Sequence, residues 1–237
     1  CAVLRREDPV HLVDVPDFNL RLAKRLKALG VPVAWYISPM VWAWRPGRVK
    51  AIAARVDRMM CILPFEETFY RGTNVDARYV GNPVVEQVPA PAPAAHFRRA
   101  LGLPVEGRLL ALLPGSRRSE ISRILPALVA AARRIDAPVV VPVAPGLERA
   151  PIALAFEGVR AHFVDGRAAE AVGASDVAVV ASGTATLEAG LMQRPLVVVY
   201  RLAPVSYWVG KAMMKLPHFS LVNLLAGRGV VPELLQA

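Results

Sequence analysis

Two turns rich in small residues, both in the second half of the chain, have the composition of a phosphate-binding site. Ser182-Gly183-Thr184 follows an apolar stretch and opens a predicted helix that carries Glu188 about one turn further on. Backbone N–H groups at a helix start bind anions, and a carboxylate at Glu188 can accept hydrogen bonds from ribose hydroxyls. Gly115-Ser116-Arg117 repeats the pattern and adds a guanidinium that can clamp a phosphate. Either turn alone could be an ordinary strand-to-helix connection, but together they predict a site for a phosphorylated ligand.

Two loops in the first half carry further polar and aromatic groups. Asp17 lies in the segment 14–19, directly after a predicted strand. A carboxylate there can act as a general base or can cap the helix that follows, and the residues alone leave both interpretations open. The second loop contains Trp42, Trp44 and Arg45. A turn that plugs the core is the favoured interpretation of Trp42, whereas Trp44 and Arg45 could line a ligand site.

Motifs for metals and common cofactors are missing from this sequence. The four histidines are scattered singly, and neither an Asp-x-Asp nor a His-Glu-x-x-His pattern occurs. We therefore expect no catalytic metal. The patterns Gly-x-x-x-x-Gly-Lys-Ser/Thr and Gly-x-Gly-x-x-Gly are also missing, which counts against a P-loop ATPase and a nicotinamide enzyme. No cofactor is expected.

Predicted strands and helices alternate along the whole chain, which indicates two α/β domains with parallel sheets. Strands are expected at 11–14, 33–37, 59–63, 78–80, 109–113, 139–141, 161–164, 177–181 and 196–200, and helices at 18–29, 45–55, 65–70, 120–135, 148–156, 168–174, 185–192 and 231–235. A run of alternating proline and alanine marks the boundary between the domains. We expect a Rossmann-like domain at 1–88, a linker at 89–106 and a second Rossmann-like domain at 107–237. Open parallel sheets bind ligands at the carboxyl ends of their strands, so the four loops should meet at a cleft between the domains.

The overall composition fits a folded protein that attracts anions. The 237 residues are 54% hydrophobic and carry a formal net charge of +10, which favours nucleotides, phospholipid headgroups or nucleic acid as partners. Basic residues are spread over many predicted helices rather than gathered on one face, which argues against a nucleic-acid-binding module. The longest uncharged stretches are shorter than the roughly 20 residues that cross a bilayer, so any membrane contact should be peripheral.

The cysteines and the chain ends bear on compartment and extent. Cys1 and Cys61 show no spacing typical of a disulfide or metal site, and Cys61 lies in an apolar run where a buried, inert thiol is expected. This usage favours a reducing, cytosolic compartment. The chain begins without methionine and stops within a predicted helix, so we interpret it as an internal fragment.

Six motifs follow the order and spacing found in one enzyme family, the lipid-A-disaccharide synthases. They are Val15-Pro16-Asp17-Phe18-Asn19, Ser38-Pro39 with Trp42-Ala43-Trp44-Arg45, Leu63-Pro64-Phe65-Glu66, Leu113-Pro114-Gly115-Ser116-Arg117, Ala181-Ser182-Gly183-Thr184 with Glu188, and Asn223-Leu224-Leu225-Ala226-Gly227-Arg228. The sequence resembles this family over nearly its whole length. The resemblance implies a GT-B fold, in which two Rossmann-like domains face each other across a cleft. It also implies an inverting glycosyltransferase that joins UDP-2,3-diacylglucosamine to 2,3-diacylglucosamine 1-phosphate (lipid X), giving lipid A disaccharide 1-phosphate and UDP.

Residue roles follow from the resemblance by position. Asp17 matches the essential aspartate of the family and is the implied general base, while Arg117 is implied to hold the charge that develops on UDP. The residues implied to bind substrate are Ser116, Ser182, Gly183, Thr184, Glu188, Asn223 and Arg228, with Trp44 and Arg45 as further candidates. The apolar run from Tyr207 to Phe219 could pack in the core or form a groove for acyl chains, and the core is the favoured interpretation.

The resemblance also implies a location and partners. It predicts a cytoplasmic enzyme that docks peripherally on the anionic inner membrane of a Gram-negative bacterium and needs no metal or cofactor. The oligomeric state stays open, and a homodimer is one state that the family allows. The nearest alternative is another metal-free GT-B transferase or epimerase that acts on UDP-N-acetylglucosamine. Such a protein would share the two phosphate turns but would have no reason to carry Asp17-Phe18-Asn19 together with the tryptophan loop.

Overall fold

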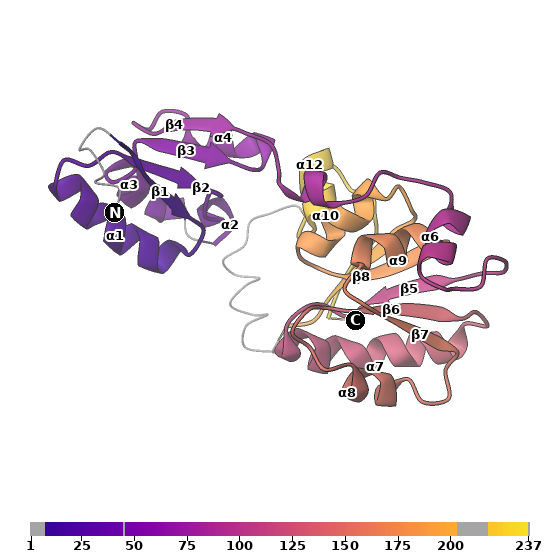
Figure 1. Cartoon of the computed structure of the whole chain (residues 1–237). Helices are drawn as coiled ribbons and strands as arrows, with labels where there is room; N and C mark the ends of the chain where they lie inside the picture. The colour runs from indigo at the N-terminus through magenta and orange to yellow at the C-terminus, as the bar shows by residue number, and fades with distance from the viewer. Residues whose placement is uncertain (1–7, 45, 203–217, 237) are drawn as a thin grey trace. The chain divides into compact units, whose positions relative to one another are not determined.

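The computed structural model describes residues 8–44, 46–202 and 218–236 of the chain. These residues form two compact units that divide between Pro83 and Val84 (Figure 1). Each unit has its own parallel β-sheet and its own buried apolar core. The two α/β units agree with the fold class that the alternating pattern predicts.

The first unit is built on a four-stranded parallel sheet in the order β1-β2-β3-β4. Its elements are β1 (Val10–Val13), α1 (Pro16–Ala28), β2 (Val33–Tyr36), α2 (Val41–Trp44), η1 (Pro46–Arg48), α3 (Val49–Ala53), β3 (Arg58–Cys61), α4 (Pro64–Tyr70) and β4 (Asp76–Tyr79). Apolar side chains of α1, α3 and α4 pack on the strands around the fully buried Trp35 and Met59. Because β1 and β2 are parallel neighbours, the loops that follow them lie at the same edge of the sheet.

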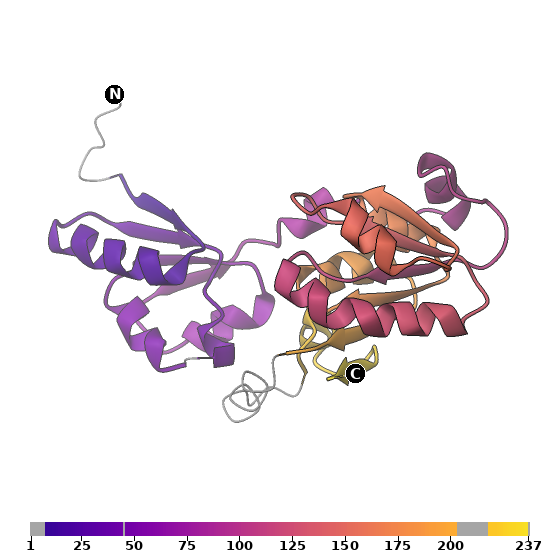
Figure 2. The same cartoon turned by 90° about the horizontal axis from the view of Figure 1, so that it is seen from below.

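The second unit contains a six-stranded parallel sheet in the order β10-β9-β8-β5-β6-β7. Its elements are α5 (Val84–Gln87), α6 (Ala94–Ala100), β5 (Leu110–Leu113), α7 (Arg118–Arg134), β6 (Val139–Val143), α8 (Arg149–Ala155), β7 (Ala161–Asp165), α9 (Ala168–Ala174), β8 (Val177–Ala181), α10 (Thr184–Leu191), β9 (Leu196–Tyr200), α12 (Leu221–Ala226) and β10 (Glu233–Leu235). Helices α7 and α8 cover one face of the sheet and α9 and α10 cover the other (Figure 1), and the face with α7 and α8 is turned toward the viewer in Figure 2. Alternate side chains of β5 point to opposite faces of the sheet. Leu113 packs in the core beneath α9, and Leu112 packs in the core beneath α7. Burial on both faces explains why this strand is a continuous apolar run.

The strand order of the second sheet reverses between β5 and β8. From β5 the chain continues to β6 and β7 on one side, and it then returns through α9 to β8, β9 and β10 on the other. Leu113 at the end of β5 pairs with Val180 near the end of β8. The loops after two such strands lead to opposite faces of the sheet and leave room for a ligand between them. These are the loops that contain the two predicted phosphate turns.

The segment predicted as a linker, 89–106, belongs to the second unit. It contains α6, and Phe97 is buried in the core beside α9. The side chain of Arg98 is also buried and donates hydrogen bonds to three backbone carbonyl groups of the same unit at 2.7 to 2.9 Å. The division between the units therefore falls earlier than the predicted boundaries at 88 and 107, because α5 already contacts α10 and α6 contacts α9.

The end of the described chain also differs from the prediction. The segment expected as a helix over 231–235 contains β10 instead, and Leu234 of this strand pairs with Val199 of β9. The prediction of a helix is wrong here because a short apolar run fits either structure. The open edge of β9 decides between them, since strand pairing satisfies its backbone hydrogen-bonding groups. In the first unit, the helix predicted at 45–55 is shorter and is represented by η1 and α3.

Candidate functional site

The two turns predicted to bind phosphate lie side by side at the ends of β5 and β8. Gly115 has a φ of +107°, and a methyl group on it would lie 3.6 Å from Cβ of Ala181 and 3.1 Å from Oε2 of Glu120. The backbone angle and the close approach of Glu120 therefore favour glycine, while the contact with Ala181 shows that the two turns are neighbours. The strand reversal thus brings Gly115-Ser116-Arg117 next to Ser182-Gly183-Thr184.

Each turn leads into the start of a helix that is open to an anion. Arg117 is the N-cap residue of α7 and Gly183 is that of α10, and within the described residues neither helix start receives a side-chain cap. Gly183 and Thr184 are exposed, and the space beside Gly183 is open. Helix starts carry a positive partial charge and free N–H groups. Two of them at one sheet edge can bind a diphosphate.

An ion pair adds a fixed positive group beside the glycine turn. Nη1 of Arg117 donates a hydrogen bond to Oε1 of Glu120 at 2.6 Å, and 77% of the Arg117 side chain is exposed. The hydrogen bond and the charge of Glu120 raise the pKa of Arg117. Ser116 is exposed next to it. The guanidinium is therefore held in place by Glu120 and still faces solvent, where it can meet a phosphate.

Sequence reasoning missed two polar residues of this site. Glu120 lies three residues after Arg117, and this spacing from the N-cap to the first turn of α7 commonly brings two side chains together and could have been recognised. Tyr200 is the last residue of β9, and burial followed by the nearby charge of Glu120 raises the pKa of its hydroxyl. The rule that ligands meet the carboxyl ends of parallel strands would have selected Tyr200 as well.

Glu188 lies on α10, one turn after the Ser182-Gly183-Thr184 turn. Its side chain is half-buried, and this burial raises the pKa of the carboxyl group. In the part of the chain that the structure describes, no hydrogen bond or ion pair reaches this carboxyl group. Buried polar groups usually have hydrogen-bond partners, so Glu188 keeps its capacity for a ligand such as a ribose.

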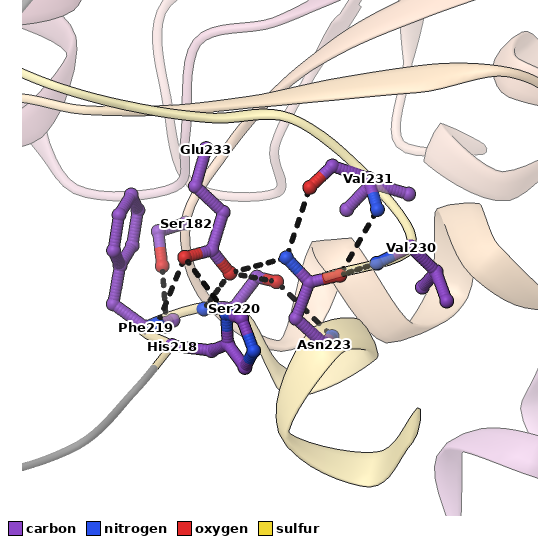
Figure 3. Close-up of polar contacts among 8 residues, drawn as sticks. All are labelled: Ser182, His218, Phe219, Ser220, Asn223, Val230, Val231 and Glu233. Carbon is purple, nitrogen blue, oxygen red and sulfur yellow. Dashed lines mark hydrogen bonds and ion pairs between the residues drawn. The ribbon is translucent and has the colours of Figure 1, made fainter. Parts of the chain in front are cut away.

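Asn223 and Glu233 form a buried polar network behind the turn (Figure 3). Nδ2 of Asn223 donates to the carbonyl oxygen of Val231 at 2.9 Å and to Oε1 of Glu233 at 2.8 Å. Its Oδ1 accepts hydrogen bonds from the N–H groups of Val230 and Val231 at 2.8 and 3.0 Å. Asn223 is only 1% exposed. In this structure all the hydrogen-bonding groups of its side chain are engaged within the protein, where they support the neighbouring loops, and its contact with a substrate stays a prediction.

Two other predicted contacts adjoin this network. Oγ of Ser182 donates a hydrogen bond to the carbonyl oxygen of Phe219 at 3.2 Å, so the turn is tied to the segment before α12. Arg228 is exposed and lies two residues before Val230, whose N–H group Asn223 holds. The network therefore connects to the Ser182 turn and to the loop that carries Arg228.

In the first unit, Asp17 lies in the first turn of α1. The N-cap residue is Val15, and Asp17 makes no cap hydrogen bond but pairs with Nη1 of Arg48 at 2.8 Å. The Asp17 side chain is 76% exposed. The capping interpretation therefore does not describe this residue. Its carboxylate is oriented by Arg48 and remains accessible, which a general base requires.

The loop that precedes Asp17 is strained. Asp14 and Val15 have φ angles of +46° and +39°, in the left-handed region that a β-branched residue rarely adopts. The buried Asn19 holds this shape, since its Nδ2 donates to the carbonyl oxygens of Val13 and Asp14 at 3.0 and 2.7 Å. Strain of this kind persists only where surrounding contacts fix it, and it is concentrated at functional sites.

The loop after β2 packs partly into the first unit. Nε1 of Trp42 donates to Oε1 of the buried Glu66 at 3.0 Å, and its ring meets Phe65 edge to face at 4.9 Å. This packing agrees with the interpretation of Trp42 as part of a core-plugging turn. Trp44 ends α2, and Arg45 lies outside the described residues, as do 207–217 of the apolar run. The thiol of Cys61 is buried, and this burial, with the charges of Glu66 and Glu67, raises its pKa to about 12, as expected for an inert cysteine.

Within residues 8–44, 46–202 and 218–236, no three side chains of histidine, cysteine, aspartate or glutamate gather where they could hold a metal ion. None of the helices that the structure describes has the length and apolar character needed to cross a membrane.

Two α/β units with parallel sheets, the second with a strand reversal, are typical of the GT-B class of glycosyltransferase folds. The chain is similar in fold to a putative UDP-N-acetylglucosamine 2-epimerase from Listeria monocytogenes, with a TM-score of 0.55 and 15% identity over 93% of this chain and 64% of that one. It is also similar to MurG from Acinetobacter baumannii, with a TM-score of 0.51 and 11% identity over 90% of this chain and 56% of that one. At these identities the likeness concerns the fold alone.

A comparison of sequences gives the family. The family model described as lipid-A-disaccharide synthetase matches residues 3–237. A lipid-A-disaccharide synthase of Myxococcus xanthus (strain DK1622) is 64% identical over 99% of this chain. The chain belongs to the lipid-A-disaccharide synthetase family, which confirms the resemblance seen in its motifs. It spans 63% of the length of the Myxococcus relative.

Proposed function

We propose that this chain carries the substrate-binding and catalytic residues of a lipid-A-disaccharide synthase. The reaction would join UDP-2,3-diacylglucosamine to lipid X and release UDP, as part of lipid A biosynthesis. The observation that carries the proposal is the meeting of two phosphate turns at the strand reversal of a chain that belongs to this family. The second unit would bind the sugar nucleotide, and the first unit would supply the base.

The second unit supports binding of the donor and departure of UDP. The diphosphate would accept hydrogen bonds from the N–H groups at the starts of α7 and α10, with the hydroxyl groups of Ser116 and Thr184 close by. Arg117, held by Glu120, would neutralise the charge that grows on the diphosphate as its bond to the sugar breaks. Glu188 would accept hydrogen bonds from the ribose, and Arg228 would reach the same ligand from its exposed loop.

The first unit supports activation of the acceptor. Asp17, oriented by Arg48, would take the proton from the 6-hydroxyl group of lipid X. The resulting oxygen attacks the anomeric carbon of the donor from the face opposite the diphosphate. The bond from that carbon to the diphosphate oxygen breaks, and the configuration inverts. Trp44 and Arg45 stay predicted contacts of the acceptor.

The proposal includes a location. A net charge of +10 favours an anionic surface, and both lipid substrates reside in a bilayer. The enzyme would act at the cytoplasmic face of the inner membrane of a Gram-negative bacterium, docked peripherally. A homodimer is compatible with this arrangement.

The proposal is tested by turnover of UDP-diacylglucosamine and lipid X by the full-length protein. Asp17→Asn should lower kcat by about 10²- to 10⁴-fold, the usual contribution of a general base. Asp76→Asn is the matched control, because Asp76 is an ion-paired carboxylate of the same unit that has no proposed role. Arg117→Ala should lower kcat by about 10²- to 10³-fold.

The neighbouring Arg118 provides the control for Arg117. Arg118 is exposed and paired with Glu148, so Arg118→Ala should leave turnover unchanged. Unchanged turnover in Asp17→Asn would rule out the general-base assignment. A wild-type protein that releases UDP from UDP-N-acetylglucosamine alone would instead favour the alternative GT-B transferase or epimerase.

A further inference from the structure

The carboxylate of Glu233 on β10 is the centre of the network drawn in Figure 3. Oε1 accepts hydrogen bonds from the N–H group of Ser220 at 2.9 Å, from Oγ of Ser220 at 2.6 Å and from Nδ2 of Asn223 at 2.8 Å. Oε2 accepts a hydrogen bond from the N–H group of Phe219 at 3.2 Å and lies 3.9 Å from Nδ1 of His218. The side chain is only 10% exposed. All four hydrogen bonds to this carboxylate come from donors of the chain, which favours its ionised form.

The hydrogen bonds outweigh the cost of burying this charge. Burial by itself would raise the pKa of Glu233, but the hydrogen bonds from Ser220, Phe219 and Asn223 lower it below its ordinary value. Hydrogen bonds from several donors to one carboxylate stabilise the charged form. Glu233 is therefore ionised at neutral pH and fixed in one orientation.

One arm of the network reaches the phosphate turn. Glu233 holds the backbone of Phe219, and the carbonyl oxygen of Phe219 accepts the hydrogen bond from Oγ of Ser182. The ring of Phe219 also stacks on Tyr200, with centroids 6.3 Å apart and planes at 28°. Fixing Phe219 thus fixes two groups at the carboxyl ends of β8 and β9.

The other arm reaches the loop that carries Arg228. Glu233 orients the amide of Asn223, and Oδ1 of Asn223 holds the N–H groups of Val230 and Val231. A change at Glu233 is therefore transmitted to the Ser182 turn and to the Arg228 loop together.

We propose that Glu233 is a positioning residue for the donor site, because it fixes the Ser182 turn and the Arg228 loop through Ser220, Phe219 and Asn223. Glu233 itself does not touch the sugar nucleotide. This inference rests on the proposed function, in which these two segments bind UDP-diacylglucosamine.

The test measures UDP binding by calorimetry and steady-state turnover with the full-length protein. Glu233→Gln replaces one acceptor oxygen by an NH₂ group that faces donors, so UDP should bind about tenfold more weakly, which corresponds to about 1.4 kcal/mol. Glu233→Asp keeps an acceptor-only carboxylate and should bind UDP more tightly than the Gln variant. Ser220→Ala removes one of the donors and should also weaken UDP binding, by less than Glu233→Gln does. The KM for lipid X should stay at the wild-type value in all three.

A matched control separates positioning from loss of stability. Arg98→Lys disturbs buried hydrogen bonds at the amino ends of the strands of the same unit, so it should lower the melting temperature and leave UDP affinity unchanged. Wild-type UDP affinity in Glu233→Gln and Ser220→Ala overturns the inference. The inference is also overturned if the Glu233 and Ser220 variants raise the KM for lipid X by as much as they weaken UDP binding. It is overturned as well if Arg98→Lys loses as much UDP affinity as Glu233→Gln, because either result indicates general destabilisation. A wild-type protein that does not bind UDP refutes the proposed function itself.

Discussion

Substitution of Gly115 tests the proposed donor site, because an added methyl group would have two separate effects: one on the backbone and one on Glu120. Gly115→Ala would force a φ of +107° on a residue with a side chain, which costs about 1–3 kcal/mol of stability. It would also place a methyl group 3.1 Å from Oε2 of Glu120, so that this carboxylate must move. Glu120 holds Arg117 at 2.6 Å, and the guanidinium would move with it. Loss of one hydrogen bond from Arg117 to the diphosphate of UDP is worth about 1.5–3 kcal/mol. UDP should therefore bind about 10- to 100-fold more weakly.

Gly158→Ala is the control that isolates the backbone cost. Gly158 has a φ of +80° and nothing within 4 Å of the added methyl group, and it precedes β7 at the amino edge of the sheet. Both variants should therefore lose stability in urea unfolding, but only Gly115→Ala should lose UDP affinity in calorimetry. If Gly115→Ala binds UDP as tightly as the wild type, the reasoning that Glu120 and Arg117 depend on this glycine is refuted.

Two further predictions concern stability. Arg98→Met should lower the free energy of unfolding by about 1–3 kcal/mol, because it leaves the buried carbonyl group of Ala174 without its donor. The exposed Arg99→Met should cost little, and equal urea midpoints for the two variants would contradict this. Glu188→Gln should stabilise the protein at pH 7 and weaken UDP binding. Burial raises the pKa of Glu188, so folding favours the protonated form. The stabilisation should therefore be present above the folded pKa and vanish as the pH falls below the unfolded value, as unfolding measured between pH 3 and pH 7 at about one-unit steps would show.

The features that sequence reasoning found were those with local signals. The turns at Gly115 and Ser182 each combine an apolar strand, small residues and a helix start within a few positions, so their nature is visible in the sequence. Their adjacency follows from the rule for strand reversals. For Asp17, the local pattern allowed a cap or a base. The structure places the N-cap at Val15, and the general-base role stays a prediction.

The features that it missed depend on contacts between distant segments. Glu233 sits in a run that fits a helix or a strand, and its role exists only because β9 offers an edge and Ser220 offers donors. Asn223 was recognised by its motif, but only the fold shows that its side chain is buried and holds the N–H groups of Val230 and Val231. Likewise, nothing local marks Arg98 as a buried residue that anchors the segment after the prolines.

The strand reversal in the second unit has a consequence for folding. The two phosphate turns follow β5 and β8, which are separated in the chain by β6 and β7 and their helices, and they meet only when β8 pairs with β5. Such long-range pairing is slow compared with local structure, because the intervening chain must first be ordered. Before β8 pairs with β5, a folding chain would have only one of the two turns of the proposed anion site in place. Ligand would therefore bind only after this last pairing and would selectively stabilise the completed unit.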